Sequence, residues 1–204
     1  MLINSINKTF LEIFKPDILL IASSTGGPQT LEKIFAKISG TLRIPIIIVQ
    51  HMPPVFTSIL ADKITSLSKI ECAEAQNQQS LSQKKIYIAP GDFHLSLIKV
   101  ENEIFLNLTK TEPRNFVRPC ADYLFESAAH IYGNTCLGLV LTGMGSDGRD
   151  GALEVRKQGG KIIIQDKESS VVWGMPSAVY QANAFDDILS IEELTKLIQQ
   201  KCCT

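Results

Sequence analysis

The sequence predicts an α/β fold: a doubly wound, mainly parallel sheet with helices on both faces and an antiparallel hairpin at its edge. Short runs rich in Ile and Val recur along the chain, and longer amphipathic stretches separate them. The apolar runs lack the alternation of a half-exposed strand, so they are typical of strands buried on both faces. Strands that alternate with helices in this way favour a parallel sheet.

Five apolar runs are expected to form the sheet: 17–23, 44–50, 85–89, 137–142 and 161–165. Four amphipathic stretches are expected to be helices: 28–38, 121–131, 148–158 and a segment that begins at Ser190. Ser190 is a favoured N-cap residue, and the acidic residues that follow it suit a first helical turn. Two alternating runs joined by Glu101 and Asn102 predict the hairpin, over 93–100 and 103–110.

Composition places the chain among ordinary globular proteins. Its 204 residues are 45% hydrophobic and 20% charged, enough for one domain, which we expect over 17–204 after an N-terminal stub at 1–16. The net charge of -1 gives no general attraction to nucleic acid or to an anionic membrane. No apolar run approaches the roughly 20 residues of a membrane span, and the N-terminus lacks a signal-peptide pattern.

The five cysteines show no metal-ligand spacing. Without an export signal, we interpret them as reduced thiols of a cytoplasmic protein. Cys202 and Cys203 stand beside the C-terminus, and we expect them in an unordered tail.

Polar side chains follow three of the expected strands. Ser24 follows the first strand, His51 follows the second, and Asp147 lies in the glycine-rich loop after the fourth. Because the carboxyl ends of parallel strands meet at one edge, these three groups are expected to lie together. A hydroxyl, an imidazole and a carboxylate are the groups of an acyl-transfer triad, in which Ser24 is the nucleophile, His51 the base and Asp147 the residue that orients the imidazole. Backbone N–H groups near Gly26 and Met144 are candidates for an oxyanion hole.

Other interpretations of the same residues remain open at this level. Ser24 and Asp147 are also good helix caps, and the glycine loops could bind an anion in a nucleotide-binding module. Against the latter, the chain lacks both G-x-G-x-x-G and G-x-x-x-x-G-K-[ST]. A zinc site of His51, His94 and Asp147 finds no support in an H-E-x-x-H motif or a cysteine pair. The triad order Ser, His, Asp also differs from that of α/β-hydrolases, and no G-x-S-x-G elbow surrounds Ser24.

Six segments together carry a resemblance to a known family. In chain order they are ASSTGG, QHMP, YIAPGDFH, RPCADYLF, LTGMGSDG and VVWGMP. Over roughly residues 17 to 200 the chain resembles the catalytic domain of the bacterial chemotaxis protein-glutamate methylesterase (CheB) family. The resemblance implies an α/β enzyme that hydrolyses glutamate γ-methyl esters of chemoreceptors to release methanol, and in many members also deamidates receptor glutamines, without metal or organic cofactor.

By position, the resemblance places the nucleophile on Ser24, the base on His51 and the acid on Asp147, with Thr25 and Met144 beside the reacting centre. It implies a methylated chemoreceptor as protein substrate. It also leaves open a receiver domain or another regulator acting in trans. Only some 16 residues precede the first strand, so we expect no phosphorylation switch in cis. A different ester or amide substrate for the same mechanism is the alternative.

Further residues near these motifs have two interpretations each. Ser23 is expected to pack at the strand end instead of reacting. His94 is either a rim residue or a structural histidine, and Arg118 either faces an acidic substrate or forms an ion pair. The loop 173–176 is expected to shape the ester pocket, and His130 is assigned no role.

Overall fold

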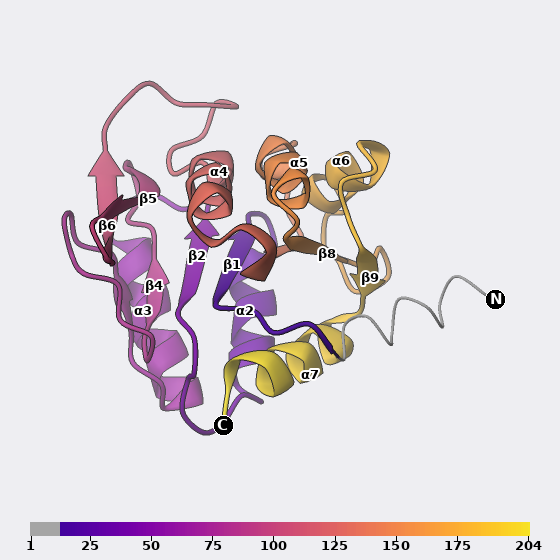
Figure 1. The fold of residues 1–204 in the computed structure, drawn as a ribbon. Coiled ribbons are helices and arrows are strands. Elements are labelled where there is room, and N and C mark those ends of the chain that lie inside the picture. The colour runs from indigo at the N-terminus through magenta and orange to yellow at the C-terminus, as the bar shows by residue number, and fades with distance from the viewer. Residues whose placement is uncertain (1–12) are drawn as a thin grey trace.

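A seven-stranded parallel sheet forms the centre of the computed structural model, which describes residues 13–204 (Figure 1). Most of the expected N-terminal stub therefore lies outside the described residues. The strands are, in spatial order, β3 (Cys72–Glu74), β4 (Ile86–Ile88), β2 (Ile46–Gln50), β1 (Ile18–Ser23), β7 (Cys136–Val140), β8 (Lys161–Gln165) and β9 (Asp187–Leu189). Every neighbouring pair in this sheet is parallel, as expected from the unbroken apolar runs.

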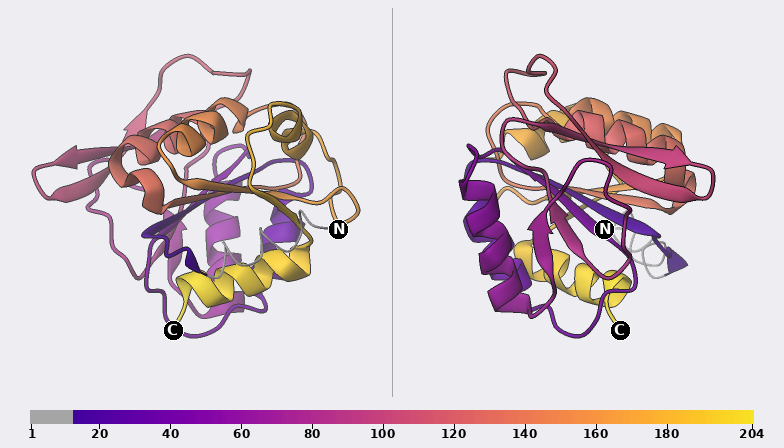
Figure 2. Two further views of the ribbon diagram at one scale, coloured as in Figure 1. Left: turned by 45° about the vertical axis from the view of Figure 1, so that its right-hand side comes forward. Right: turned by 90° about the vertical axis from the view of Figure 1, so that its left-hand side faces the viewer.

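Helices cover both faces of the sheet (Figures 1 and 2). One face packs against α2 (Gly27–Phe35), α3 (Phe56–Ser68) and α7 (Ile191–Cys202). The other packs against α4 (Ala121–Tyr132), α5 (Arg149–Lys157) and α6 (Met175–Gln181), and a 3-10 turn, η1 (Gly133–Thr135), follows α4.

Alternation along the strands divides the apolar side chains between two cores. In β1, Leu19 and Ile21 belong to the core under α2, α3 and α7, whereas Ile18, Leu20 and Ala22 belong to the core under α4, α5 and α6. Burial on both faces is the reason why the strand sequence shows no polar alternation.

The expected hairpin is present as β5 (His94–Val100) and β6 (Glu103–Thr109), paired antiparallel. It forms a separate two-stranded sheet, and none of its described residues joins the parallel ladder. Instead it packs on α4, where the Ser127 hydroxyl accepts a hydrogen bond from the backbone N–H of Leu97 at 2.9 Å.

The C-terminal residues correct one expectation, because they are ordered and not a loose tail. Cys202 is the last residue of α7 and is fully buried, and Cys203 forms an antiparallel bridge with Leu42. The backbone N–H of Thr204 donates to the carbonyl of Thr41 at 2.9 Å. Burial of Cys202 in the core under α7 supplies the free energy that holds this end of the chain.

Five elements were not expected from the sequence: α3, β3, η1, α6 and β9. Over the described residues, no helix combines the length and the apolar character needed to cross a bilayer.

Candidate active site

The three residues of the candidate triad follow the carboxyl ends of three neighbouring strands, so they lie at one edge of the sheet. β1 lies between β2 and β7. Ser24 follows β1 directly, His51 follows β2 directly, and Asp147 lies in the loop between β7 and α5. The His51 N–H donates to the Ser23 carbonyl at 3.1 Å, and the Ser24 N–H donates to the Thr142 carbonyl at 3.0 Å. Backbone pairing thus sets these segments side by side, as the order of strand ends predicts.

The two adjacent serines have different surroundings. The Ser23 hydroxyl is buried and donates to Gln50 Oε1 at 2.7 Å, on the same face as Leu19 and Ile21. Ser24 follows the last residue of β1, and Gln50 Nε2 donates to its carbonyl oxygen at 3.0 Å, whereas no hydrogen bond of Gln50 goes to its hydroxyl. The hydroxyl of Ser23 is therefore used in packing, in agreement with the expected role.

His51 and Asp147 form a hydrogen-bonded pair, with 2.7 Å between Nε2 and Oδ2. The His51 side chain is 11% exposed and that of Asp147 only 3%. Since Nε2 faces the carboxylate, Nδ1 is the ring nitrogen available to a hydroxyl. No hydrogen bond joins Ser24 Oγ to His51 within residues 13–204, a looseness that is common in enzymes without bound substrate.

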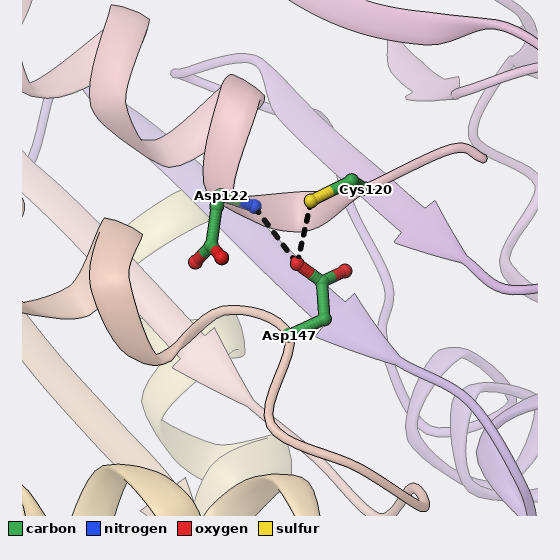
Figure 3. Close-up of side chains that lie close together, drawn as sticks. All are labelled: Cys120, Asp122 and Asp147. Carbon is green, nitrogen blue, oxygen red and sulfur yellow. Dashed lines mark hydrogen bonds between the residues drawn. The ribbon is translucent and has the colours of Figure 1, made fainter. Parts of the chain in front are cut away.

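The Asp147 carboxylate accepts four further hydrogen bonds, three from the start of α4 and one from Gly148. Figure 3 shows the two from Cys120 and Asp122. Oδ2 accepts from the N–H of Ala121, and Oδ1 accepts from the Cys120 thiol at 2.8 Å and from the N–H groups of Asp122 and Gly148. Burial alone would raise the pKa of Asp147, but the hydrogen bonds from His51, Cys120 and Ala121 outweigh burial and hold this pKa below its usual value. The residue is therefore a carboxylate that can orient the imidazole.

Two buried groups beside Asp147 have raised pKa values. Burial, and then the negative charge of Asp147, raises the pKa of Asp122 to about 6. Burial also raises the pKa of the Cys120 thiol, which Figure 3 shows directed at Asp147. Cys120, Asp122 and Asp147 are close enough together to bind a metal ion, but a thiol that donates to a carboxylate is not the thiolate that such a site needs.

The helix-cap interpretations are also settled by the structure. Gly26 is the N-cap residue of α2, with φ of 80°, so Ser24 does not cap this helix. Gly148 is the N-cap residue of α5, whereas Asp147 accepts from the first N–H groups of α4. Asp147 thus joins α4 to the loop after β7.

The expected oxyanion loops lie against each other. A side chain at Gly26 would place its Cβ 2.5 Å from Cβ of Val171, so only glycine fits there. The Gly143 carbonyl accepts from the N–H groups of Gly174 and Met175, which fixes the Met144 loop beside the loop 173–176. Thr25 and Met144 are both exposed at this rim, open to a ligand.

His94 and Arg118 have defined partners in the structure. His94 is 1% exposed, its ring lies tilted against that of Tyr123 with 4.5 Å between the centroids, and burial lowers its pKa. Arg118 donates to Asp92 from Nε at 2.9 Å, as the ion-pair alternative expects, and it also lines a cavity next to His51.

The remaining histidine interpretations find no support in the part of the chain that is described. His94 does not group with His51 and Asp147 as a set of metal ligands there. His130 is exposed on α4 beside Glu126 and Glu154, and belongs to no part of the site.

A cavity of about 460 Å³ lies beside His51, the candidate general base. It is lined by His51, Met52, Pro53, Pro54, Asp92, Phe116, Val117 and Arg118. The cavity offers space for a substrate segment next to the imidazole.

Sequence reasoning missed the buried residues that hold the site. Gln50 contacts the carbonyls of Ser24 and His51, Thr142 Oγ1 donates to the Thr25 carbonyl at 2.9 Å, and Cys120 holds Asp147. The sequence does contain an indication of a role for Gln50, because it is a polar residue at the last position of an otherwise apolar strand.

Comparison with known proteins agrees with the resemblance. The sequence model of the CheB methylesterase family matches residues 19–198. A protein-glutamate methylesterase/protein-glutamine glutaminase of Maricaulis maris is 47% identical over 180 residues, which are 88% of this chain and 45% of that protein. One of the same name from Trichodesmium erythraeum is 42% identical over 190 residues, or 93% of this chain and 54% of that protein.

The fold has a counterpart among solved structures. The crystal structure of the Thermotoga maritima CheB methylesterase catalytic domain superposes with a TM-score of 0.87 at 40% identity, covering 91% of this chain and 99% of that one. The chain spans about half the length of the curated relatives it matches. The parallel sheet, the separate hairpin and the sequence match together place this chain in the CheB methylesterase family.

Proposed function

We propose that this chain is a serine hydrolase that removes methyl groups from glutamate γ-methyl esters of chemoreceptors and releases methanol. The observation that carries the proposal is the 2.7 Å pair of His51 and Asp147 beside Ser24 in a member of this family. The five free thiols agree with a cytoplasmic location, which is part of the proposal.

In the first half of the reaction, His51 Nδ1 takes the proton of Ser24 as Oγ attacks the ester carbonyl. Asp147 keeps the imidazole in the required tautomer and stabilises the imidazolium. Backbone N–H groups near Gly26 and Met144 bind the negative oxygen of the tetrahedral intermediate. The intermediate collapses, the methoxy group takes the proton from His51, methanol leaves, and the glutamyl group stays on Ser24.

In the second half, His51 takes a proton from water, and the resulting hydroxide attacks the glutamyl ester. Ser24 leaves with the proton that His51 returns, and the product is a free glutamate side chain. A glutamine side chain can follow the same path with ammonia as the leaving group. The relatives' names, which include protein-glutamine glutaminase, support this second substrate.

The direct test is methanol release from methylated chemoreceptor by the intact chain, Ser24→Ala and Ser23→Ala. We expect Ser24→Ala to lower the rate by about 10⁴-fold or more, as for other triads. Ser23→Ala should retain most activity because its hydroxyl bonds to Gln50. Equal rates for all three proteins would exclude Ser24 as nucleophile. Hydrolysis of small p-nitrophenyl esters without methanol release would support a different ester substrate.

A further inference from the structure

Gln50 is a buried carboxamide directly behind the candidate triad. It is the last residue of β2, is 1% exposed, and pairs with Ser23 in the β1–β2 register. Its side chain lies on the face opposite to Asp147, together with the Ser23 hydroxyl. It therefore cannot touch a substrate held between Ser24 and His51.

Both ends of this carboxamide are engaged. Nε2 donates to the Ser24 carbonyl at 3.0 Å and to the His51 carbonyl at 3.2 Å, while Oε1 accepts from the Ser23 hydroxyl. Carbonyl oxygens can only accept, so the amide can have only this orientation. A Cβ at Gly27 would lie 2.0 Å from Oε1, which shows how closely α2 encloses the side chain.

The Gln50 hydrogen bonds lie at the point where the pairing of β1 and β2 ends. The backbone ladder between β1 and β2 ends where the His51 N–H donates to Ser23. The next residues, Ser24 and His51, leave the sheet, and the Gln50 side chain bridges their carbonyls in place of a further ladder bond. We infer that Gln50 is a positioning residue that fixes the separation of Ser24 and His51; this inference rests on the function proposed above.

Proton transfer from Ser24 to His51 needs the two atoms within hydrogen-bond reach, about 2.6–3.2 Å. An error of about 1 Å in such a geometry can cost on the order of 10²-fold in rate. Without the two Nε2 bonds, the Ser24 and His51 segments can move apart, although the substrate surface is unchanged.

Two variants remove the donors and keep the shape. Gln50→Met and Gln50→Leu have no hydrogen-bond donor at the end of the side chain, and both also lose the acceptor for Ser23. We expect kcat for methanol release to fall by about 10²-fold in each, with KM within about twofold of the intact chain. Thr65→Val is the matched control, because Thr65 Oγ1 makes two hydrogen bonds to the backbone of Cys72, remote from the site.

The second readout is the rate at which a fluorophosphonate labels Ser24, which needs no receptor. Labelling should fall with kcat in both Gln50 variants and stay unchanged in Thr65→Val, each measured well below its melting temperature. If the Gln50 variants match Thr65→Val in kcat and labelling, Gln50 is only structural and the inference is wrong, while the proposed function stands.

Failure of the proposed function gives a different pattern. An intact chain that is labelled at Ser24 but releases no methanol contradicts the receptor substrate, and the labelling rates of the Gln50 variants then decide the inference. An intact chain that is not labelled at Ser24 overturns both, because no activated serine exists for Gln50 to position.

Discussion

At the residue scale, the carboxyl pair Asp122 and Asp147 sets a pH dependence of stability. The pKa of Asp122 is raised to about 6 by burial and by the charge of Asp147, above the roughly 3.9 of an unfolded chain. The folded state therefore binds a proton on Asp122 more tightly than the unfolded chain does. Above pH 6, where Asp122 is ionised in both states, this contribution to stability is lost. As pH falls from 7.5 to 4.5, its protonation stabilises the fold by an amount on the order of 2 kcal/mol.

Urea unfolding of the intact chain and of Asp122→Asn at pH 7.5 and 4.5 measures this contribution. We expect the neutral variant to gain stability relative to the intact chain at pH 7.5 and to lose that advantage at pH 4.5. A difference between the two proteins that does not change with pH would show that Asp122 is ionised throughout.

Cys120 is the second residue-scale test, since its thiol donates to Asp147 Oδ1 at 2.8 Å. Cys120→Ala removes one donor from a buried carboxylate, and we expect a loss of on the order of 1–3 kcal/mol in stability together with lower activity. Cys120→Ser keeps a donor and should restore most of both. Thermal unfolding and methanol release of the two variants provide the comparison, and equal behaviour would contradict a role for the thiol hydrogen.

At the element scale, α3 begins with a strained residue. Val55 is its N-cap residue, with φ of 76°, and its side chain is 68% exposed. This backbone conformation suits glycine and is unfavourable for a β-branched side chain. We expect Val55→Gly to raise the free energy of unfolding by about 1 kcal/mol. Val100→Gly, at an exposed position in β5, should lower it, and a loss of similar size in both variants would contradict the strain.

The same residue explains why α3 was not predicted. A helix that starts without a side-chain cap, at a strained valine, gives no start signal in the sequence. β3 and β9 are three residues long and partly polar, so they lack the Ile and Val runs that identified the central strands. The five strands that were predicted, β1, β2, β4, β7 and β8, could be identified because their apolar residues are buried on both faces of the sheet.

The candidate site also has features that the sequence predicts and features that it does not. The order of strand ends predicts that the loops of Ser24, His51 and Asp147 meet. The ring orientation of His51 and the bonds of Gln50 and Cys120 join residues far apart in sequence, so local patterns carry no information about them. They depend on which strands are neighbours and on how α4 meets the β7 loop.

At the scale of the whole molecule, two apolar cores leave no cysteine at the surface. All five thiols are free and buried, and burial raises the pKa of Cys72 and of Cys136 to about 12. We expect a thiol reagent such as DTNB to react with none of them in the folded protein and with five after denaturation. Rapid reaction of Cys202 and Cys203 in the folded protein would instead show that the C-terminal residues form a loose tail.

The proposed function requires that His51 and Asp147 activate Ser24. The most direct measurement is peptide mapping by mass spectrometry after a fluorophosphonate reaction, on the intact chain and on His51→Ala. We predict a single adduct on Ser24 in the intact chain and its loss, or a rate lower by several orders of magnitude, in His51→Ala. An adduct on another residue, or one that forms on Ser24 equally fast without His51, would contradict the proposed triad.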